Sequence, residues 1–154
     1  WDDTIAGRRY VGTEQCISCH SSPYEQWFGT RHASAYATLL SVHRHHYPKC
    51  VVCHVAGAGH PTGFDILKPE NSLANVQCEI CHGPGSLHVA SAGKGGIERA
   101  TGEARCRECH RVPHIATTAS FVFEDQRRLI LGPGHGLPPP ATLSTAPPTQ
   151  EQTR

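Results

Sequence analysis

The stretch Cys16-Ile17-Ser18-Cys19-His20 decides the fold of this chain, because its pattern returns three more times. C-x-x-C-H is the attachment signature of c-type haem: the two thiols form thioethers with the porphyrin, and the histidine that follows can bind the iron. A separation of three residues puts both sulfurs on one side of a helical turn. The four copies contain all eight cysteines, Cys16, Cys19, Cys50, Cys53, Cys78, Cys81, Cys106 and Cys109, and the four predicted proximal ligands, His20, His54, His82 and His110.

Two other interpretations of the cysteines are weaker. Paired C-x-x-C units also bind zinc, and eight cysteines in a small extracytoplasmic chain could form disulfides. Neither explains a histidine directly after every second cysteine. Histidine is 12 of the 154 residues, so four such coincidences have a chance probability on the order of 10⁻⁵ to 10⁻⁴. The sequence therefore predicts four haem c groups as cofactors.

The composition is poor for building a core from side chains alone. Apolar residues make up 38% of the chain, below the roughly 45–50% of ordinary globular proteins, and there are 15 glycines and 12 prolines. Four porphyrins would replace apolar side chains in the interior. We therefore expect a mainly α chain with large irregular content and little or no β-sheet, built around haem and dependent on haem attachment for folding.

The charge balance gives no case for nucleic-acid binding, because the formal net charge is only +1. No apolar run approaches the roughly 20 residues of a membrane span. Haem is attached to C-x-x-C-H outside the cytoplasm, so the motif predicts a location in the periplasm or beyond. The start at Trp1, without Met, is expected for a mature chain whose signal peptide has been removed.

Helices are expected at the attachment sites and after the first of them. Ser22 followed by Pro23 reads as an N-cap and first helical position, and this helix is expected to run to about Leu40 with a weak point at Gly29. Further helices are expected over residues 72–82 and 103–110, with a short helical piece at residues 87–89. The Gly- and Pro-rich residues 56–69 predict a loop.

The chain divides into two parts by composition. Residues 1–136 hold the four motifs and are predicted to form one tetrahaem domain. Residues 137–154 are dominated by Pro, Thr, Ala and Gln, a composition typical of a disordered or polyproline-type tail. We expect this tail to dock on a neighbouring subunit.

Eight histidines lie outside the motifs, although a soluble domain of this size has roughly three to four in all. Four irons with open sixth positions would explain the surplus. The chain has no Met, so His/Met ligation within it is excluded. Ligation by two histidines leaves no open position and suits electron transfer better than substrate chemistry. The eight are His32, His43, His45, His46, His60, His88, His114 and His135.

Over about residues 10–136 the sequence resembles the cytochrome c554 family of multihaem cytochromes. The resemblance rests on Tyr-Val-Gly-Thr at 10–13, Tyr-Glu-Gln-Trp at 24–27, Arg-His-Ala at 31–33, and the run from Asn75 through Cys-His-Gly-Pro-Gly-Ser to His88. In that family, distal ligands come from the first helix, from just after the Cys-His-Gly-Pro-Gly-Ser turn, and from near the C-terminal end. The resemblance therefore implies His32, His88 and His135 as distal iron ligands.

The fourth distal ligand is where this sequence departs from the family. The nitrifier-type member has one five-coordinate haem, which is its candidate reactive site. Here a histidine cluster, His43, His45 and His46, stands just before the second motif. We predict that it supplies the missing ligand, through His46 or through His43 or His45 in its place, to a haem of this chain or of a neighbour. His60 and His114 are expected beside a ligand or at the surface.

Electron transfer through four haems is the function that these observations favour, and catalysis is not expected. The finer hypothesis resembles the tetrahaem cytochromes that form extracellular conducting filaments, or nanowires. Its partners would be further copies of the chain, head to tail, together with redox proteins or extracellular electron acceptors. The alternatives are a discrete periplasmic carrier and a redox enzyme that acts on a small nitrogen compound at a five-coordinate haem. No hydrolytic or nucleotide-binding motif is present.

Overall fold

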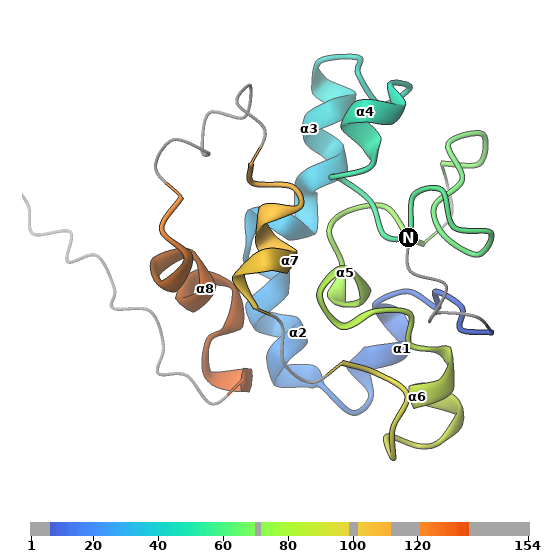
Figure 1. Ribbon diagram of the computed structural model, residues 1–154, viewed down its shortest axis with the longest axis vertical. Coiled ribbons are helices and arrows are strands. Elements are labelled where there is room, and N and C mark those ends of the chain that lie inside the picture. The colour runs from blue at the N-terminus through green and yellow to red at the C-terminus, as the bar shows by residue number, and fades with distance from the viewer. Residues whose placement is uncertain (1–6, 70–71, 99–101, 112–120, 136–154) are drawn as a thin grey trace, which may run out of the picture.

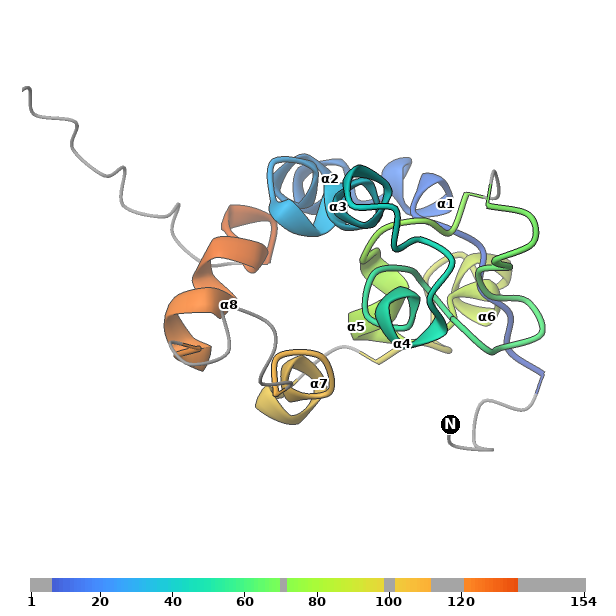
Figure 2. The same cartoon turned by 90° about the horizontal axis from the view of Figure 1, so that it is seen from above.

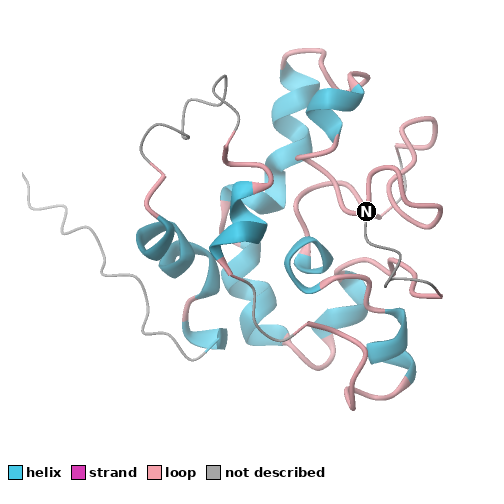
Figure 3. Ribbon diagram, viewed as in Figure 1, coloured by secondary structure: helices cyan, strands magenta, loops and turns pink. Residues whose placement is uncertain are grey.

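A computed structural model describes residues 7–69, 72–98, 102–111 and 121–135. Short helices joined by long loops make up this part of the chain, and no strand occurs in it (Figure 3). The predicted fold class, mainly α with large irregular content, is confirmed. The helices are α1 (Glu14–Ile17), α2 (Ser21–Phe28), η2 (Arg31–Ser34), α3 (Ala35–Ser41), α4 (Pro48–Val51), α5 (Cys78–His82), α6 (Ser86–Ala90), α7 (Glu103–Arg107), α8 (Phe123–Leu131) and η3 (Pro133–His135).

The long helix expected after the first motif is present in pieces, as α2, η2 and α3. The interruption follows Gly29, the predicted weak point, because Thr30 is extended with φ −97° and ψ 163°. The Thr30 hydroxyl donates to the Trp27 carbonyl (2.7 Å), which satisfies one of the carbonyls at the end of α2. The expected N-cap at Ser22 is wrong, since α2 already begins at Ser21 and has no side-chain cap.

The helix expected over residues 72–82 is reduced to α5, which carries only the motif itself. Asn75 adopts a left-handed conformation with φ +77°, which a helix cannot contain. The side-chain amide of Gln77 donates to the Ala74 carbonyl (2.8 Å), so a side chain takes the place of helical hydrogen bonds. The helices expected near residues 87–89 and 103–110 are present as α6 and α7.

The polypeptide core surrounds the second motif. Gly57 and Gly63 allow two turns of the 56–64 loop to touch, because a Cβ on Gly63 would overlap the Gly57 carbonyl. The Phe64 amide then reaches the Ala56 carbonyl (2.9 Å) and closes the loop. The predicted loop therefore contributes to the interior. The buried apolar cluster consists of Tyr10, Tyr36, Leu39, Val51, Val55, Ala56, Phe64 and Leu73.

Figures 1 and 2 show α2 and α3 as one column, with α8 on one side of it and α4, α5 and α6 on the other. Helix α2 contacts both α8 and η3, and the Gln26 amide donates to the Leu129 carbonyl (2.9 Å). This packing brings the end of the described chain back to the first third of the sequence. Within the described ranges, no helix is long and apolar enough to cross a membrane.

Candidate haem and iron sites

Each C-x-x-C-H motif lies on or directly after a short helix. Helices α1, α4 and α7 contain the first cysteine of their motifs, and α5 contains a whole motif. The backbone amides of His20 and His110 bond back to the carbonyls of Cys16 (2.9 Å) and Cys106 (3.0 Å). The His54 amide bonds to the Val51 carbonyl (2.8 Å) in the same way. The local fold thus fixes each predicted proximal histidine beside its pair of cysteines.

Three of these histidines face a second imidazole. The ring centroids of His20 and His88 are 6.1 Å apart, those of His32 and His110 are 6.1 Å apart, and those of His82 and His135 are 6.2 Å apart. The rings of the first and third pairs are close to parallel, at 23° and 4°. Two imidazoles that bind one metal ion from opposite faces, with metal–nitrogen bonds of about 2.0 Å, have centroids roughly 6 Å apart. The spacing fits an iron between the rings and is too wide for direct stacking.

Backbone carbonyls set the tautomers of several of these rings. The Nδ1–H groups of His82, His88 and His135 donate to the carbonyls of Glu98 (2.7 Å), Gly95 (3.0 Å) and Leu131 (2.8 Å). The Nδ1–H of His54 donates to the Ala35 carbonyl (2.6 Å). A neutral imidazole that donates through Nδ1 keeps its Nε2 lone pair free for a metal. These residues therefore suit an axial haem ligand.

His32 lies between the second and fourth sites. Burial, together with the nearby His110 and His54, lowers the pKa of His32 to about 4. An imidazole with this pKa is neutral over the whole physiological range. It is therefore available as a metal ligand without first losing a proton.

The second site differs from the other three. Within the described ranges, His54 has no imidazole opposite it at the 6 Å spacing. The histidine cluster lies on the loop between α3 and α4, where His43 and His46 are exposed. The rings of His45 and His46 contact each other, with centroids 3.7 Å apart, and His45 also contacts Tyr36. His60 instead lies against Tyr10 and accepts the Thr62 amide at Nδ1 (3.1 Å). His114 lies outside the described residues.

Cysteines of different motifs meet in pairs. Cys16 hydrogen-bonds to Cys78, which raises the pKa of Cys16 and lowers that of Cys78 to about 7. Cys53 and Cys109 form a second pair, in which the pKa of Cys109 is raised and that of Cys53 is lowered to about 7. The contacts join the first site to the third, and the second site to the fourth.

The third and fourth sites are also neighbours. Burial, together with the nearby Cys106, raises the pKa of Cys81 to about 11. Cys81 also contributes to raising the pKa of Cys109, in the fourth motif. Together with the two hydrogen-bonded pairs, this proximity places the attachment sites in the spatial order first, third, fourth, second.

A buried carboxylate holds the first and third sites together. Glu79 lies inside the third motif and is only 2% exposed. It accepts the amides of Val11 (3.0 Å), Gly12 (2.8 Å) and Gly85 (2.7 Å). Next to it, the side-chain Oε1 of Gln77 accepts hydrogen bonds from both the backbone amide and the hydroxyl of Thr13. The segment that leads into the first motif is thereby fixed against the third.

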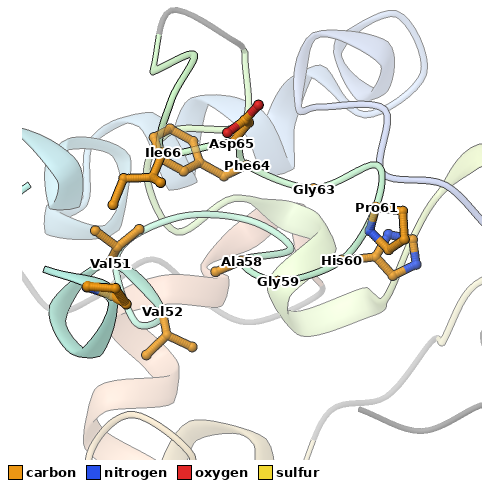
Figure 4. Close-up of a pocket in the computed structure, with 11 residues that line it drawn as sticks. Val51, Val52, Ala58, Gly59, His60, Pro61, Gly63, Phe64, Asp65 and Ile66 are labelled. Carbon is orange, nitrogen blue, oxygen red and sulfur yellow. The ribbon is translucent and has the colours of Figure 1, made fainter. Parts of the chain in front are cut away.

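An apolar cavity of about 570 Å³ lies beside the second motif. Its walls come from α4 and from the loop that follows (Figure 4). The motif contributes its two central residues, Val51 and Val52, and neither its cysteines nor His54 line the cavity. The cavity is therefore separate from the second attachment site. The other lining residues are Pro48, Ala58, Gly59, His60, Pro61, Gly63, Phe64, Asp65 and Ile66.

Comparisons with known proteins bear on the cofactor. Residues 15–83 match the family model described as cytochrome c554 and c-prime. That range covers the first three motifs and a little under half of the chain. The structure resembles the reduced state of cytochrome c554 from Nitrosomonas europaea, with a TM-score of 0.61 and 24% identity, over 80% of this chain and 83% of that chain. No curated protein matches the sequence.

The structural likeness shows that the described chain has the cytochrome c554 fold. The cytochrome match agrees with the eight paired cysteines, and the chain binds four haem c groups. The sequence did not predict the backbone contacts of the Glu79 and Gln77 side chains. It also did not predict that Arg107 lies over the ring of Phe121. A signal existed for Glu79 and Arg107, because each is a charged residue inside a C-x-x-C-H motif.

Proposed function

We propose that the chain carries electrons through four haem c groups, each held by its two cysteines and its motif histidine. His88, His32 and His135 serve as distal ligands of the first, fourth and third haems. The observation that carries this proposal is the set of three imidazole pairs about 6.1–6.2 Å apart. When bound, haem c supplies an iron that accepts and releases one electron. The paired histidines keep both axial positions closed, so that little rearrangement accompanies a change of charge.

The cysteine contacts support a path for the electrons. Cys16 and Cys78, then Cys81 and Cys106, then Cys109 and Cys53 bring neighbouring attachment sites together. The proposed path therefore runs first, third, fourth, second. The first and second sites are its two ends, where donor and acceptor proteins would dock.

Electron exchange inside one molecule is the expected result of photochemical reduction at less than one electron per chain. After the pulse, absorbance and magnetic circular dichroism should report redistribution among haems at a rate independent of protein concentration. A rate that rises in proportion to concentration would show exchange between molecules only, and would contradict the proposal. A single-haem cytochrome c, reduced in the same way, is the control without internal partners.

The finer proposal is that the chain is the subunit of an extracellular conducting filament. Its support is the second site, where His54 faces no second imidazole within the described fold, while His43 and His46 are exposed on the loop before α4. We propose that His46, or His43 or His45 in its place, binds the second haem of a neighbouring subunit. Contacts of this kind that do not close into a ring produce an open polymer.

The tail, residues 137–154, lies outside the described residues, and its docking on a neighbour is part of the same proposal. The cavity in Figure 4 has suitable chemistry for it. Two prolines and a phenylalanine are among the lining residues, and the tail has no charged residue before Glu151. Proline-rich segments bind such apolar, aromatic-lined grooves in an extended conformation.

Alanine at all three cluster positions, His43, His45 and His46, tests the filament. Wild-type protein should form long filaments in negative-stain electron microscopy, with all four haems low-spin by electron paramagnetic resonance. The triple variant should give small particles, with one haem in four high-spin and reactive with cyanide. Arg44→Ala is the matched control, because Arg44 is exposed on the same loop and carries no imidazole, so this substitution should leave both properties unchanged.

The lack of an imidazole facing His54 among the described residues also favours a second candidate function. A haem with one open axial position can bind a small molecule, which would make the second site a reactive centre. In that case wild-type protein would contain one cyanide-reactive, high-spin haem regardless of its assembly state, and the triple variant would not change it. A small-particle wild type with four low-spin haems would instead indicate a discrete periplasmic carrier.

A further inference from the structure

The third and fourth sites differ in what surrounds their histidines. At the third site, both predicted axial imidazoles donate from Nδ1 to backbone carbonyls, His82 to Glu98 (2.7 Å) and His135 to Leu131 (2.8 Å). Such bonds raise the basicity of the ligand and stabilise the more highly charged, oxidised iron. The surroundings of the third site therefore favour a low reduction potential.

At the fourth site no corresponding bond occurs among the described residues. The Nδ1 atom of His110 is buried and has no hydrogen-bond partner within that part of the chain. The ring of Phe121 covers the imidazole, with centroids 4.7 Å apart and planes 18° from parallel. An imidazole without an acceptor is a weaker donor to iron, so the oxidised state gains less from it.

A positive charge stands next to this stack. The Arg107 guanidinium lies over the Phe121 ring, 4.6 Å from its centroid, and donates to the Phe121 carbonyl (3.2 Å). Glu103, one turn earlier on α7, fixes the same guanidinium at 3.0 Å. Arg107 and the His110 imidazole therefore both lie against the Phe121 ring, 4.6 Å and 4.7 Å from its centroid. A cation at this place disfavours the oxidised, more positive iron.

We infer that Arg107 is a positioning residue that raises the reduction potential of the fourth haem above that of the third, and so gives the chain a preferred direction. This inference rests on the proposed electron-transfer function. The transfer moves one electron from the reduced iron held by His82 to the oxidised iron held by His110. The first iron is oxidised and the second reduced by one electron, and no bond or proton of the chain changes.

The test is a spectroelectrochemical titration of the haem-loaded protein, with haem-resolved nuclear magnetic resonance to follow each site. Arg107→Gln should lower the equilibrium constant for transfer from the third to the fourth haem about tenfold, which is about 59 mV for a one-electron couple. Arg107→Lys, which keeps the charge, should restore most of the difference. Glu103→Gln removes the negative charge that opposes Arg107 and should therefore raise the reduction potential of the fourth haem.

Arg127→Gln is the matched control. Arg127 also lies over a phenylalanine ring, that of Phe123 at 5.9 Å, and pairs with Glu124 at 4.0 Å. The inference would be overturned if the reduction potential of the fourth haem were unchanged in Arg107→Gln, or if Arg127→Gln shifted it equally. Failure of the electron-transfer proposal would be seen separately, as four haems that titrate but do not exchange electrons within a molecule.

Discussion

Glu79→Gln is expected to lower the free energy of unfolding of the haem-loaded protein by about 3 kcal/mol. The carboxylate is 2% exposed and accepts three backbone amides, from Val11, Gly12 and Gly85. Hydrogen bonds to a charged acceptor are stronger than neutral ones, and a glutamine keeps only one acceptor oxygen. Its amino group would face amide donors that have no other partner. At least one buried N–H would then be left unsatisfied, which carries its full desolvation cost.

Guanidinium denaturation, followed by the Soret band, measures the effect. Glu14→Gln is the control, because Glu14 is exposed and a substitution there should change the free energy of unfolding by less than about 0.5 kcal/mol. Equal midpoints for Glu79→Gln and wild type would refute the role given to this residue. A loss of stability with all four haems still attached would show that Glu79 acts on folding and not on attachment.

Alanine at His88, His32 or His135 is expected to convert one haem in four from low-spin to high-spin, a different one in each variant. Each substitution removes one imidazole of a pair and opens one axial position on the haem at the first, fourth or third motif. Electron paramagnetic resonance should then show a high-spin signal from one quarter of the iron, with the three other haems unchanged.

Methionine at the same positions separates ligation from packing. A methionine thioether can bind haem iron, and it raises the reduction potential relative to histidine. His88→Met should therefore keep the first haem low-spin and raise its potential. The chain has no native methionine, so the new ligand has a unique spectroscopic signature. A low-spin first haem in His88→Ala would mean that another group occupies the position, and would exclude His88 as its ligand.

The sequence predicted the parts of this protein that depend on local pattern. The four motifs, the lack of strands in the described part of the chain and the weak point at Gly29 follow from residue types and short spacings. Long-range polar contacts could not be predicted in this way. The extended approach to α5 depends on the left-handed Asn75 and on the side chain of Gln77, and neither changes the apolar pattern that suggested a helix over residues 72–82.

In the candidate site, too, local patterns could be predicted and long-range contacts could not. The histidines that face each other across 6 Å are far apart in sequence, so only the resemblance to known cytochromes could single them out. The cluster at His43, His45 and His46 was predicted from its position before the second motif, and the described fold does not set it opposite His54. Arg107 and Phe121 meet across a segment outside the described residues, and no spacing rule connects them.

The three imidazole pairs also have a topological consequence. Through the irons proposed between them, His20 with His88, His32 with His110 and His82 with His135 would close three loops of the chain that overlap one another in sequence. A closed loop restricts the unfolded chain, and overlapping loops cannot be released one at a time from either end. The segment between His43 and Phe64 includes the second motif but no member of these pairs. It can therefore open without breaking a pair, and such an opening would expose Val51, Val55, Ala56 and Phe64 of the buried apolar cluster.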